Sequence, residues 1–123
     1  MLHKIAYRSE AVREFSRKEL DAMLVDFRAK NQRRGITGLL RYRAKSFIQF
    51  LEGDEVKVMA LFRQIQVDER HKNVFLFLQK PIETRVWPEW WMQFEWLDGE
   101  EKFSMSDLTP QNIQQILRGF GAR

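Results

Sequence analysis

Apolar residues recur at i, i+3, i+4 and i+7 in two stretches, which are Leu20, Met23, Leu24 and Phe27, and Val58, Leu61, Phe62 and Ile65. This period predicts two amphipathic helices, each with one apolar face. Ser16 followed by Glu19 has the pattern of a capping box at the start of the first helix, and Gly35 is expected to end it. Gly53 and Asp54 are expected to open the second helix.

Five other segments have the alternation or the short apolar runs that are typical of strands. They are Leu2 to Tyr7, Ile36 to Tyr42, Ser46 to Glu52, Asn73 to Gln79 and Trp90 to Leu97. The first strand is expected to end at the polar residues Arg8, Ser9 and Glu10. The fourth is apolar on both faces, with Val74, Leu76 and Leu78 predicted on one face and Phe75 and Phe77 on the other.

A last apolar stripe lies near the end of the chain. Thr109 and Pro110 have the pattern of an N-cap and a first helical residue, and they precede Ile113, Ile116, Leu117 and Phe120. The element order is therefore β-α-β-β-α-β with an added fifth strand, which predicts an α+β, ferredoxin-like fold with two helices on one face of the sheet. We expect the helix over residues 110–120 to cover the other face, in the same chain or in a partner subunit.

The chain has 123 residues, of which 44% are hydrophobic, and this suits one compact domain. Residues 1–97 are expected to form it, and residues 98–123 to form a linker and a C-terminal capping helix. No run of about 18 apolar residues, as a membrane-spanning helix needs, is present. The absence of Cys excludes disulfides, thiolate metal sites and cysteine nucleophiles, and a cytoplasmic location is expected.

The net charge is +4, which permits binding of an anion without identifying one. The local cluster of basic residues is Arg28, Lys30, Arg33 and Arg34. We interpret it either as a solvated helix end, whose cations complement the helix dipole, or as a contact for phosphate or an acidic partner. No metal site is predicted, because His3 and His71 are the two histidines and no acidic trio accompanies them.

Two side-chain amides, Asn31 and Gln49, lie in a stretch that is otherwise largely apolar or turn-forming. On strand parity Gln49 shares a face with Phe47 and Leu51, and burial of an unpaired amide there would cost roughly 1–3 kcal/mol. An amide carries donors and an acceptor, so its partner must offer both, as a flat heterocycle does. If the first and third strands are neighbours, the Tyr7 hydroxyl approaches Gln49, and a purely structural hydrogen bond is the alternative interpretation.

Five segments of the chain, in order, resemble the BLUF domains, which sense blue light using flavin. They are Tyr7 and Ser9, Asn31 with Gly35-Ile36-Thr37-Gly38, Phe47 to Gly53 around Gln49, Asp68-Glu69-Arg70-His71, and Trp87-Pro88-Glu89-Trp90-Trp91-Met92. The resemblance runs from Leu2 to about Leu97, and the spacings of 24 residues from Tyr7 to Asn31 and 18 from Asn31 to Gln49 agree with those of the family. It implies that residues 1–97 are a flavin-binding sensor domain with FAD or FMN as cofactor.

The resemblance implies a role for each polar residue of the site. Asn31 would bond the C4 carbonyl and N3 edge of the flavin, and Gln49 would lie between Tyr7 and the N5 and O4 edge. The C2 carbonyl side would be held by Arg70, Asp68 and His71.

The apolar part of the site would be the slot between the two helices, where the ring would lie against Met23, Phe27 and Ile65. The chain departs from the common family pattern at Phe27, where many members have Ser, and at Lys30, where they tend to have His or Asn. Phe27 could crowd the ring or stack on it. Lys30 could meet the ribityl-phosphate side or face water.

The family mechanism, as the resemblance implies, has Tyr7 give an electron and a proton to the photoexcited flavin, with Gln49 relaying the proton. Recombination would leave the Gln49 amide rotated or tautomerised, and new hydrogen bonding to the flavin would shift its absorption to the red. The change would reach the fifth strand through Trp90 and Met92, for which plain core packing is the alternative role. From there it would alter the C-terminal helix or a bound partner.

The function implied is that of a photoreceptor and not of an enzyme. We expect a homo-oligomer, a dimer or larger, that signals to a downstream protein partner or a detached effector domain. An enzyme on this fold lacks support because the sequence has neither a glycine-rich phosphate loop with an adjacent Arg nor a Ser–His pair. The alternative is a flavin-free, ferredoxin-like interaction module, and neither a membrane nor a nucleic acid is expected as partner.

Overall fold

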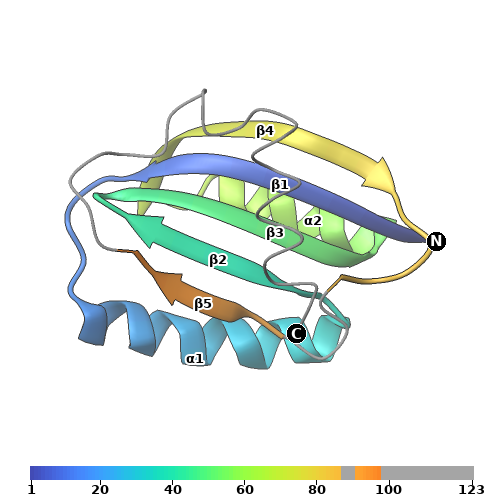
Figure 1. The fold of residues 1–123 in the computed structure, drawn as a ribbon, viewed down its shortest axis with the longest axis horizontal. Helices are drawn as coiled ribbons and strands as arrows, with labels where there is room; N and C mark the ends of the chain where they lie inside the picture. Colours follow the sequence, from blue (N-terminus) through green and yellow to red (C-terminus); the bar gives the residue numbers. More distant parts are fainter. Residues whose placement is uncertain (87–90, 98–123) are drawn as a thin grey trace.

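The computed structural model describes residues 1–86 and 91–97 (Figure 1). In chain order the elements are β1 (Leu2–Ala11), α1 (Arg17–Arg34), β2 (Thr37–Arg43), β3 (Ser46–Asp54), α2 (Glu55–Gln66), β4 (His71–Pro81) and β5 (Gln93–Trp96). The predicted order of helices and strands is thus confirmed over the described residues. The helix predicted over residues 110–120 lies outside them.

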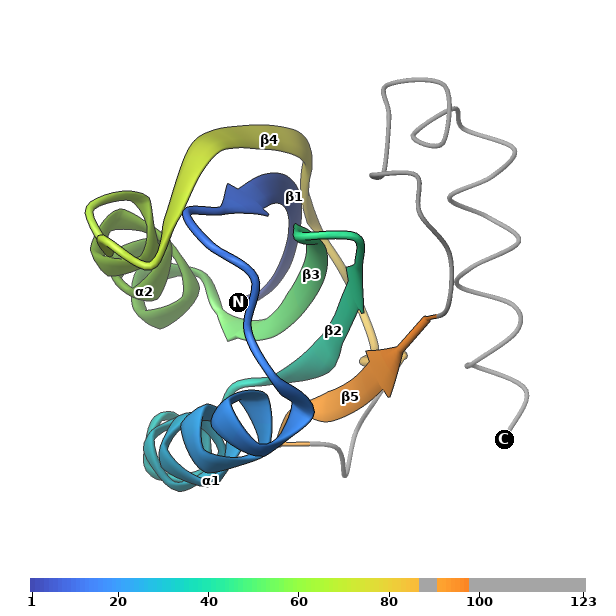
Figure 2. The same cartoon turned by 90° about the vertical axis from the view of Figure 1, so that its left-hand side faces the viewer.

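The five strands form one sheet in the order β4-β1-β3-β2-β5. All neighbours are antiparallel except β2 and β5, which are parallel. Figure 2 shows both helices on the same side of the curved sheet, with α2 beside β4 and β1 and α1 beside β2 and β5. This is the α+β, ferredoxin-like arrangement that the sequence predicts, and it leaves a space between the helices over the central strands β1 and β3.

The ends of α1 follow the local signals in the sequence. Ser16 Oγ accepts a hydrogen bond from the Glu19 backbone N–H at 3.1 Å, and Glu19 Oε1 accepts one from the Ser16 N–H at 3.1 Å. These are the two bonds of a capping box. Gly35 ends the helix with φ +68°, in the left-handed region that glycine adopts without strain.

The first strand is longer than its polarity predicts. Arg8, Ser9 and Glu10 do not end β1 but pair with β3 across from Ile48, Phe47 and Ser46. The prediction was wrong because β1 is a central strand, and its backbone groups are satisfied by ladders on both sides. Ser9 is fully buried, and its hydroxyl lies 2.8 Å from His71 Nδ1, which provides the polar partner that its burial requires.

The predicted face of Leu78 is also wrong. Tyr7 lies opposite Leu76 while the adjacent Ala6 lies opposite Leu78, so the β1–β4 register shifts at Phe77. A residue added to one strand of a pair displaces the alternation of every side chain beyond it. Leu78 therefore packs with Phe77 and not on the face of Leu76.

Two groups of apolar side chains lie on opposite faces of the sheet. The larger group fills the space under the helices and includes Phe15, Leu20, Leu24, Val58 and Phe62. The smaller consists of Ala6, Leu39, Ile48 and Phe50, with Phe77, Leu78, Val86 and Leu97 against it. The prediction that the helix over residues 110–120 covers this second group stays a prediction.

Gly38 lies where β2 approaches the backbone of β3 closely. A Cβ atom built there would lie 1.8 Å from the Phe50 carbonyl oxygen and 2.9 Å from its carbon. Only a residue without a side chain fits, and this explains why the Gly-Ile-Thr-Gly segment has glycine at position 38.

Among the residues described, no helix is long and apolar enough to cross a membrane.

Candidate functional site

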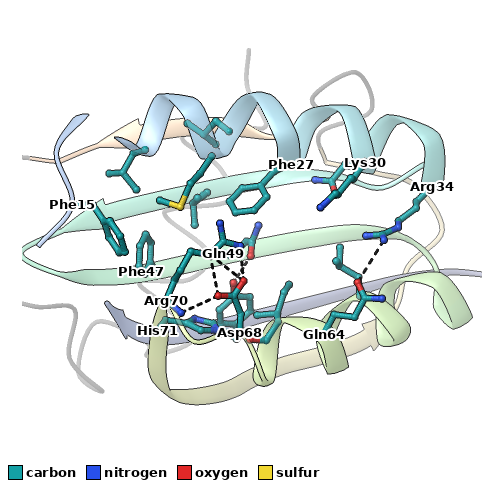
Figure 3. Close-up of a pocket in the computed structure, with 18 residues that line it drawn as sticks. Phe15, Phe27, Lys30, Arg34, Phe47, Gln49, Gln64, Asp68, Arg70 and His71 are labelled. Atoms are coloured by element: carbon teal, nitrogen blue, oxygen red, sulfur yellow. Dashed lines mark hydrogen bonds and ion pairs between the residues drawn. The ribbon is translucent and has the colours of Figure 1, made fainter. Parts of the chain in front are cut away.

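A cavity of about 170 Å³ lies between α1 and α2 over the strands β1 and β3 (Figure 3). A single buried water needs about 10–15 Å³ on the same measure, so the cavity has room for a ligand of many atoms. Apolar side chains from both helices form its walls, and polar side chains gather at the centre of its floor. The polar and charged residues that line it are Tyr7, Lys30, Asn31, Arg34, Gln49, Gln64, Asp68, Arg70 and His71.

Tyr7 and Gln49 form the floor of the cavity. They lie directly opposite each other on β1 and β3, and 4% and 7% of their surfaces are exposed. The Tyr7 hydroxyl donates a hydrogen bond to Gln49 Oε1, which confirms that the two side chains meet. Gln49 Nε2 lies 3.5 Å from Met92 Sδ. A thioether is a weak acceptor, so this buried amide has donor capacity that the described residues do not satisfy well.

The Tyr7 phenol is held in its neutral form. Burial raises the pKa of Tyr7 well above its ordinary value, and the negative charge of Asp68 raises it further, while Arg70 acts in the opposite direction. The ring packs against Phe62 at 5.7 Å between centroids and meets His71 edge-on at 6.1 Å. Loss of a proton alone from Tyr7 is therefore unfavourable, and a coupled transfer of a proton and an electron avoids the buried charge.

Asn31 projects from α1 into the cavity wall and is 4% exposed. Its Nδ2 donates to the Trp91 carbonyl oxygen at 2.8 Å. Its Oδ1 accepts no hydrogen bond from the described residues and is available to a ligand. On the same helix Lys30 pairs with Asp26 at 2.9 Å, and this pair is about half exposed.

The opposite wall carries an ion pair between Arg70 and Asp68, with Arg70 Nη2 2.5 Å from Asp68 Oδ2. The hydrogen bond from Arg70 lowers the pKa of Asp68 and raises that of Arg70 itself. The guanidinium carbon of Arg70 lies 5.1 Å from the centre of the Phe27 ring, so this side chain, which follows α2 in the chain, reaches across the cavity to α1. The bonds to Asp68 use Nε and Nη2 of Arg70, and Nη1 makes no bond to another residue that the structure describes.

Both ring nitrogens of His71 have partners in the protein. Nε2 contacts the Ile65 carbonyl oxygen, which only accepts, so Nε2 carries a hydrogen, and Nδ1 lies 2.8 Å from the Ser9 hydroxyl. His71 is thereby a side chain fixed at both ring nitrogens, and it meets the Tyr7 ring edge-on. Among the residues described there is no cluster of three or more metal-ligating side chains.

The structure brings together all the side chains that the sequence suggests for cofactor binding. They are Tyr7, Met23, Phe27, Lys30, Asn31, Gln49, Ile65, Asp68, Arg70 and His71, and each lines the cavity. Met92 lies beside Gln49 and is 2% exposed. Trp90 lies outside the described residues, so its role stays a prediction.

Sequence reasoning missed Arg34 and Gln64, which also line the cavity and contact each other across it at 3.5 Å. Helical spacing could have found both. Arg34 is three residues after Asn31, and Gln64 is three residues after Leu61, so each continues a face that already points into the cavity. Arg34 belongs to the basic cluster and lies in the last turn of α1, half-buried, where it lines the cavity.

Comparison with known proteins gives a consistent result. A family model, BLUF, described as sensors of blue light using FAD, matches residues 2–93. The photoactivated adenylate cyclase subunit beta of Euglena gracilis is 34% identical over 90 residues, which are 73% of this chain and 10% of that protein. The blue light- and temperature-regulated antirepressor BluF of Escherichia coli is 32% identical over 74 residues, 60% of this chain and 18% of that protein.

Solved structures agree with the sequence matches. The dark state of BlrB, a BLUF protein, superposes with a TM-score of 0.84 at 28% identity, over 98% of this chain and 96% of that one. The photo-activated state of BlsA superposes with a TM-score of 0.85 at 27% identity, over 100% and 96%. A bacterial light-regulated adenylyl cyclase gives 0.77 at 31% identity, over 97% of this chain and 35% of that one. The chain spans about a tenth of the length of the Euglena cyclase subunits that it matches.

Proposed function

The chain belongs to the BLUF family of flavin-binding blue-light sensors, and from this premise we propose that Tyr7 and Gln49 are its photochemical pair. The observation that carries the proposal is the buried hydrogen bond from the Tyr7 hydroxyl to Gln49 Oε1, at the floor of the cavity. The family description names FAD, which argues against the alternative of a flavin-free interaction module.

The residues present fit a flavin. Gln49 Nε2 has only a sulfur as acceptor and Asn31 Oδ1 has no donor within the described residues, so a ring edge that offers both an acceptor and a donor would satisfy them. Arg70 adds a cation for a carbonyl, with Asp68 and His71 holding that side. Apolar side chains from both helices, Met23, Phe27 and Ile65 among them, supply walls for a flat ring, and Lys30 lies near the rim.

Bound flavin supplies blue-light absorption and an acceptor for one electron and one proton. Tyr7 holds the proton that moves, at a hydroxyl that already points at Gln49 Oε1. Gln49 would take that proton at Oε1 and give one from Nε2 to the flavin. If the Gln49 side chain turns before the electron and a proton return to Tyr7, Tyr7 and the flavin are restored and Gln49 is left rotated or tautomerised. Nothing is consumed, and the lasting product is a different set of hydrogen bonds around Gln49.

The output follows from what Gln49 touches. Met92 Sδ accepts from Nε2 in this structure, and a rotated or tautomerised amide presents a different atom to it. Met92 leads directly into β5, so we propose that β5 moves and that Trp90 takes part. Residues 1–97 would then be the sensor and 98–123 a linker and capping helix that passes the change on.

The partner is proposed from the relatives, which include subunits of photoactivated adenylate cyclases. We propose that this sensor acts in the cytoplasm on a separate protein partner or an effector domain, as part of a homo-oligomer, and performs no catalysis itself.

The test is the absorption spectrum of the purified protein before and after blue light, for the wild type and for Tyr7→Phe. The wild type should carry flavin and show a reversible red shift. Tyr7→Phe keeps the ring packed against Phe62 and should bind flavin without the shift. A full photocycle in the variant would refute the role of Tyr7, and a colourless wild type that takes up no flavin would refute the function.

A further inference from the structure

The backbone that leads into β5 is held by two side chains of α1. Arg28 Nε donates to the Met92 carbonyl oxygen at 2.8 Å, and Asn31 Nδ2 donates to the Trp91 carbonyl oxygen at 2.8 Å. Arg28 and Asn31 are three residues apart, so they project from the same face of the helix. Consecutive carbonyl groups of the segment are thus both bonded to one rigid element.

These bonds matter because the backbone of β5 has few partners, although its side chains are held by the Arg41–Glu95 ion pair and by packing of Trp96 on Tyr42. It has four residues and, within residues 1–86 and 91–97, lies at the edge of the sheet and pairs with β2 alone. A short parallel ladder contributes few hydrogen bonds. At its far end the Leu97 N–H bonds to the Tyr42 carbonyl oxygen at 2.9 Å. Among the described residues, Arg28 and Asn31 are therefore the side chains whose bonds fix the backbone where this strand begins.

Met92 makes two contacts, one inside the site through its side chain and one outside the cavity through its backbone. Its sulfur contacts Gln49 inside the site, and its carbonyl oxygen contacts Arg28, which does not line the cavity. A change in the Gln49 amide alters the first contact directly and leaves the second in place. For β5 to shift as a unit, the bond between Arg28 and the Met92 carbonyl must also break.

We propose that Arg28 is a positioning residue that holds β5 in its dark position and sets how readily light displaces it; this rests on the proposed function. Its bond to Met92 opposes the movement that a changed Gln49 amide starts. Without Arg28, β5 visits the displaced position in the dark, and the difference between dark and light becomes smaller.

The test is amide hydrogen exchange, followed by mass spectrometry over Gln93–Trp96, in the dark and under blue light, on the protein as purified. Arg28→Gln removes the charge and shortens the side chain. Arg33→Gln is the matched control, because Arg33 is an exposed cation on the same helix with no bond to β5. Arg28→Lys keeps the charge and one donor group, and should restore part of the effect.

In the dark, Arg28→Gln should exchange roughly tenfold faster than the wild type over Gln93–Trp96, as expected for the loss of one hydrogen bond from a charged donor. The ratio of light to dark exchange should fall, while flavin content and the size of the red shift stay unchanged. Arg33→Gln should match the wild type throughout, and Arg28→Lys should lie between the wild type and Arg28→Gln.

Unchanged dark exchange in Arg28→Gln would overturn the proposal. So would a loss of protection spread over the whole sheet, since Arg28 would then support the fold and not β5. A colourless wild type would contradict the proposed function, and the dark comparison would still decide whether Arg28 holds β5.

Discussion

Replacing Gln49 with Leu removes the amide while keeping a side chain of similar length in the strand. In the wild type this amide is 7% exposed and accepts from Tyr7, but among the residues that the structure describes its Nε2 reaches only a sulfur, at 3.5 Å. The protein therefore buries a donor that is poorly satisfied until a ligand arrives. We expect that Gln49 therefore adds little to the stability of the flavin-free protein.

The expected change in the free energy of unfolding for Gln49→Leu is the sum of two opposing terms. Gln49→Leu leaves the buried Tyr7 hydroxyl without its acceptor, which costs roughly 1–3 kcal/mol. It also removes a buried amide whose donor is weakly bonded, and this stabilises the folded protein by about 1–3 kcal/mol. We expect the free energy of unfolding of the flavin-free protein to change by less than about 1.5 kcal/mol, because the two terms are of equal size and opposite sign.

The assay is urea denaturation of the flavin-free wild type, Tyr7→Phe, Gln49→Leu and the double variant. Freeing the protein of flavin removes the stabilisation that any bound ligand adds. The double variant has neither the hydroxyl nor the amide, and the cycle should give a coupling energy of about 0.5–1.5 kcal/mol between the two side chains. With flavin added, Gln49→Leu should bind it and show no red shift.

A loss of more than about 3 kcal/mol in Gln49→Leu alone would refute this reasoning, since it would mean that the amide is well satisfied without a ligand. A coupling energy near zero would show that the Tyr7–Gln49 bond does not exist in solution.

Three further predictions concern binding, pH and the sheet. Asn31→Ala should raise the dissociation constant for flavin about tenfold, because a buried amide that bonds the ring edge is lost, and a titration monitored by flavin fluorescence measures it. The pKa of Tyr7 is raised in the folded protein, so its contribution to stability is fully present below its unfolded pKa of about 10 and is lost as the pH rises beyond it. Urea denaturation should therefore show that the free energy of unfolding falls above about pH 10. The fall should be smaller in Tyr7→Phe. Gly38→Ala should destabilise the protein by about 3 kcal/mol, because the new methyl group overlaps the Phe50 carbonyl, and an unchanged thermal midpoint would contradict it.

Local patterns predicted the elements well because their causes are local. The capping box at Ser16, the left-handed Gly35 and the two apolar helix faces are each contained within a few residues. The prediction that Arg8, Ser9 and Glu10 end the first strand was wrong because their place in β1 is decided by pairing with β3 and β4, which are both far away in sequence. The face of Leu78 was missed for the same reason, since the register shift arises from pairing.

The site was predicted in two different ways. The unusual burial of Gln49 and the parity of its strand indicated a ligand from the residues alone, and the resemblance supplied the names of the other lining residues. The bonds from Arg28 and Asn31 to the start of β5 join segments about 60 residues apart, and no periodicity reports a contact between a side chain and a distant carbonyl. Arg34 was within reach of helical spacing but was grouped in a basic cluster that was interpreted either as a solvated helix end or as a contact for phosphate or an acidic partner.

The central claim, that light changes the Gln49 amide, is tested most directly by infrared difference spectroscopy on protein labelled with carbon-13 at the glutamine side-chain carbonyl. The light-minus-dark spectrum of the wild type should contain a carbonyl band that moves with the label, and this band should be absent in Gln49→Leu. A wild-type difference spectrum in which no band responds to the label would contradict the account.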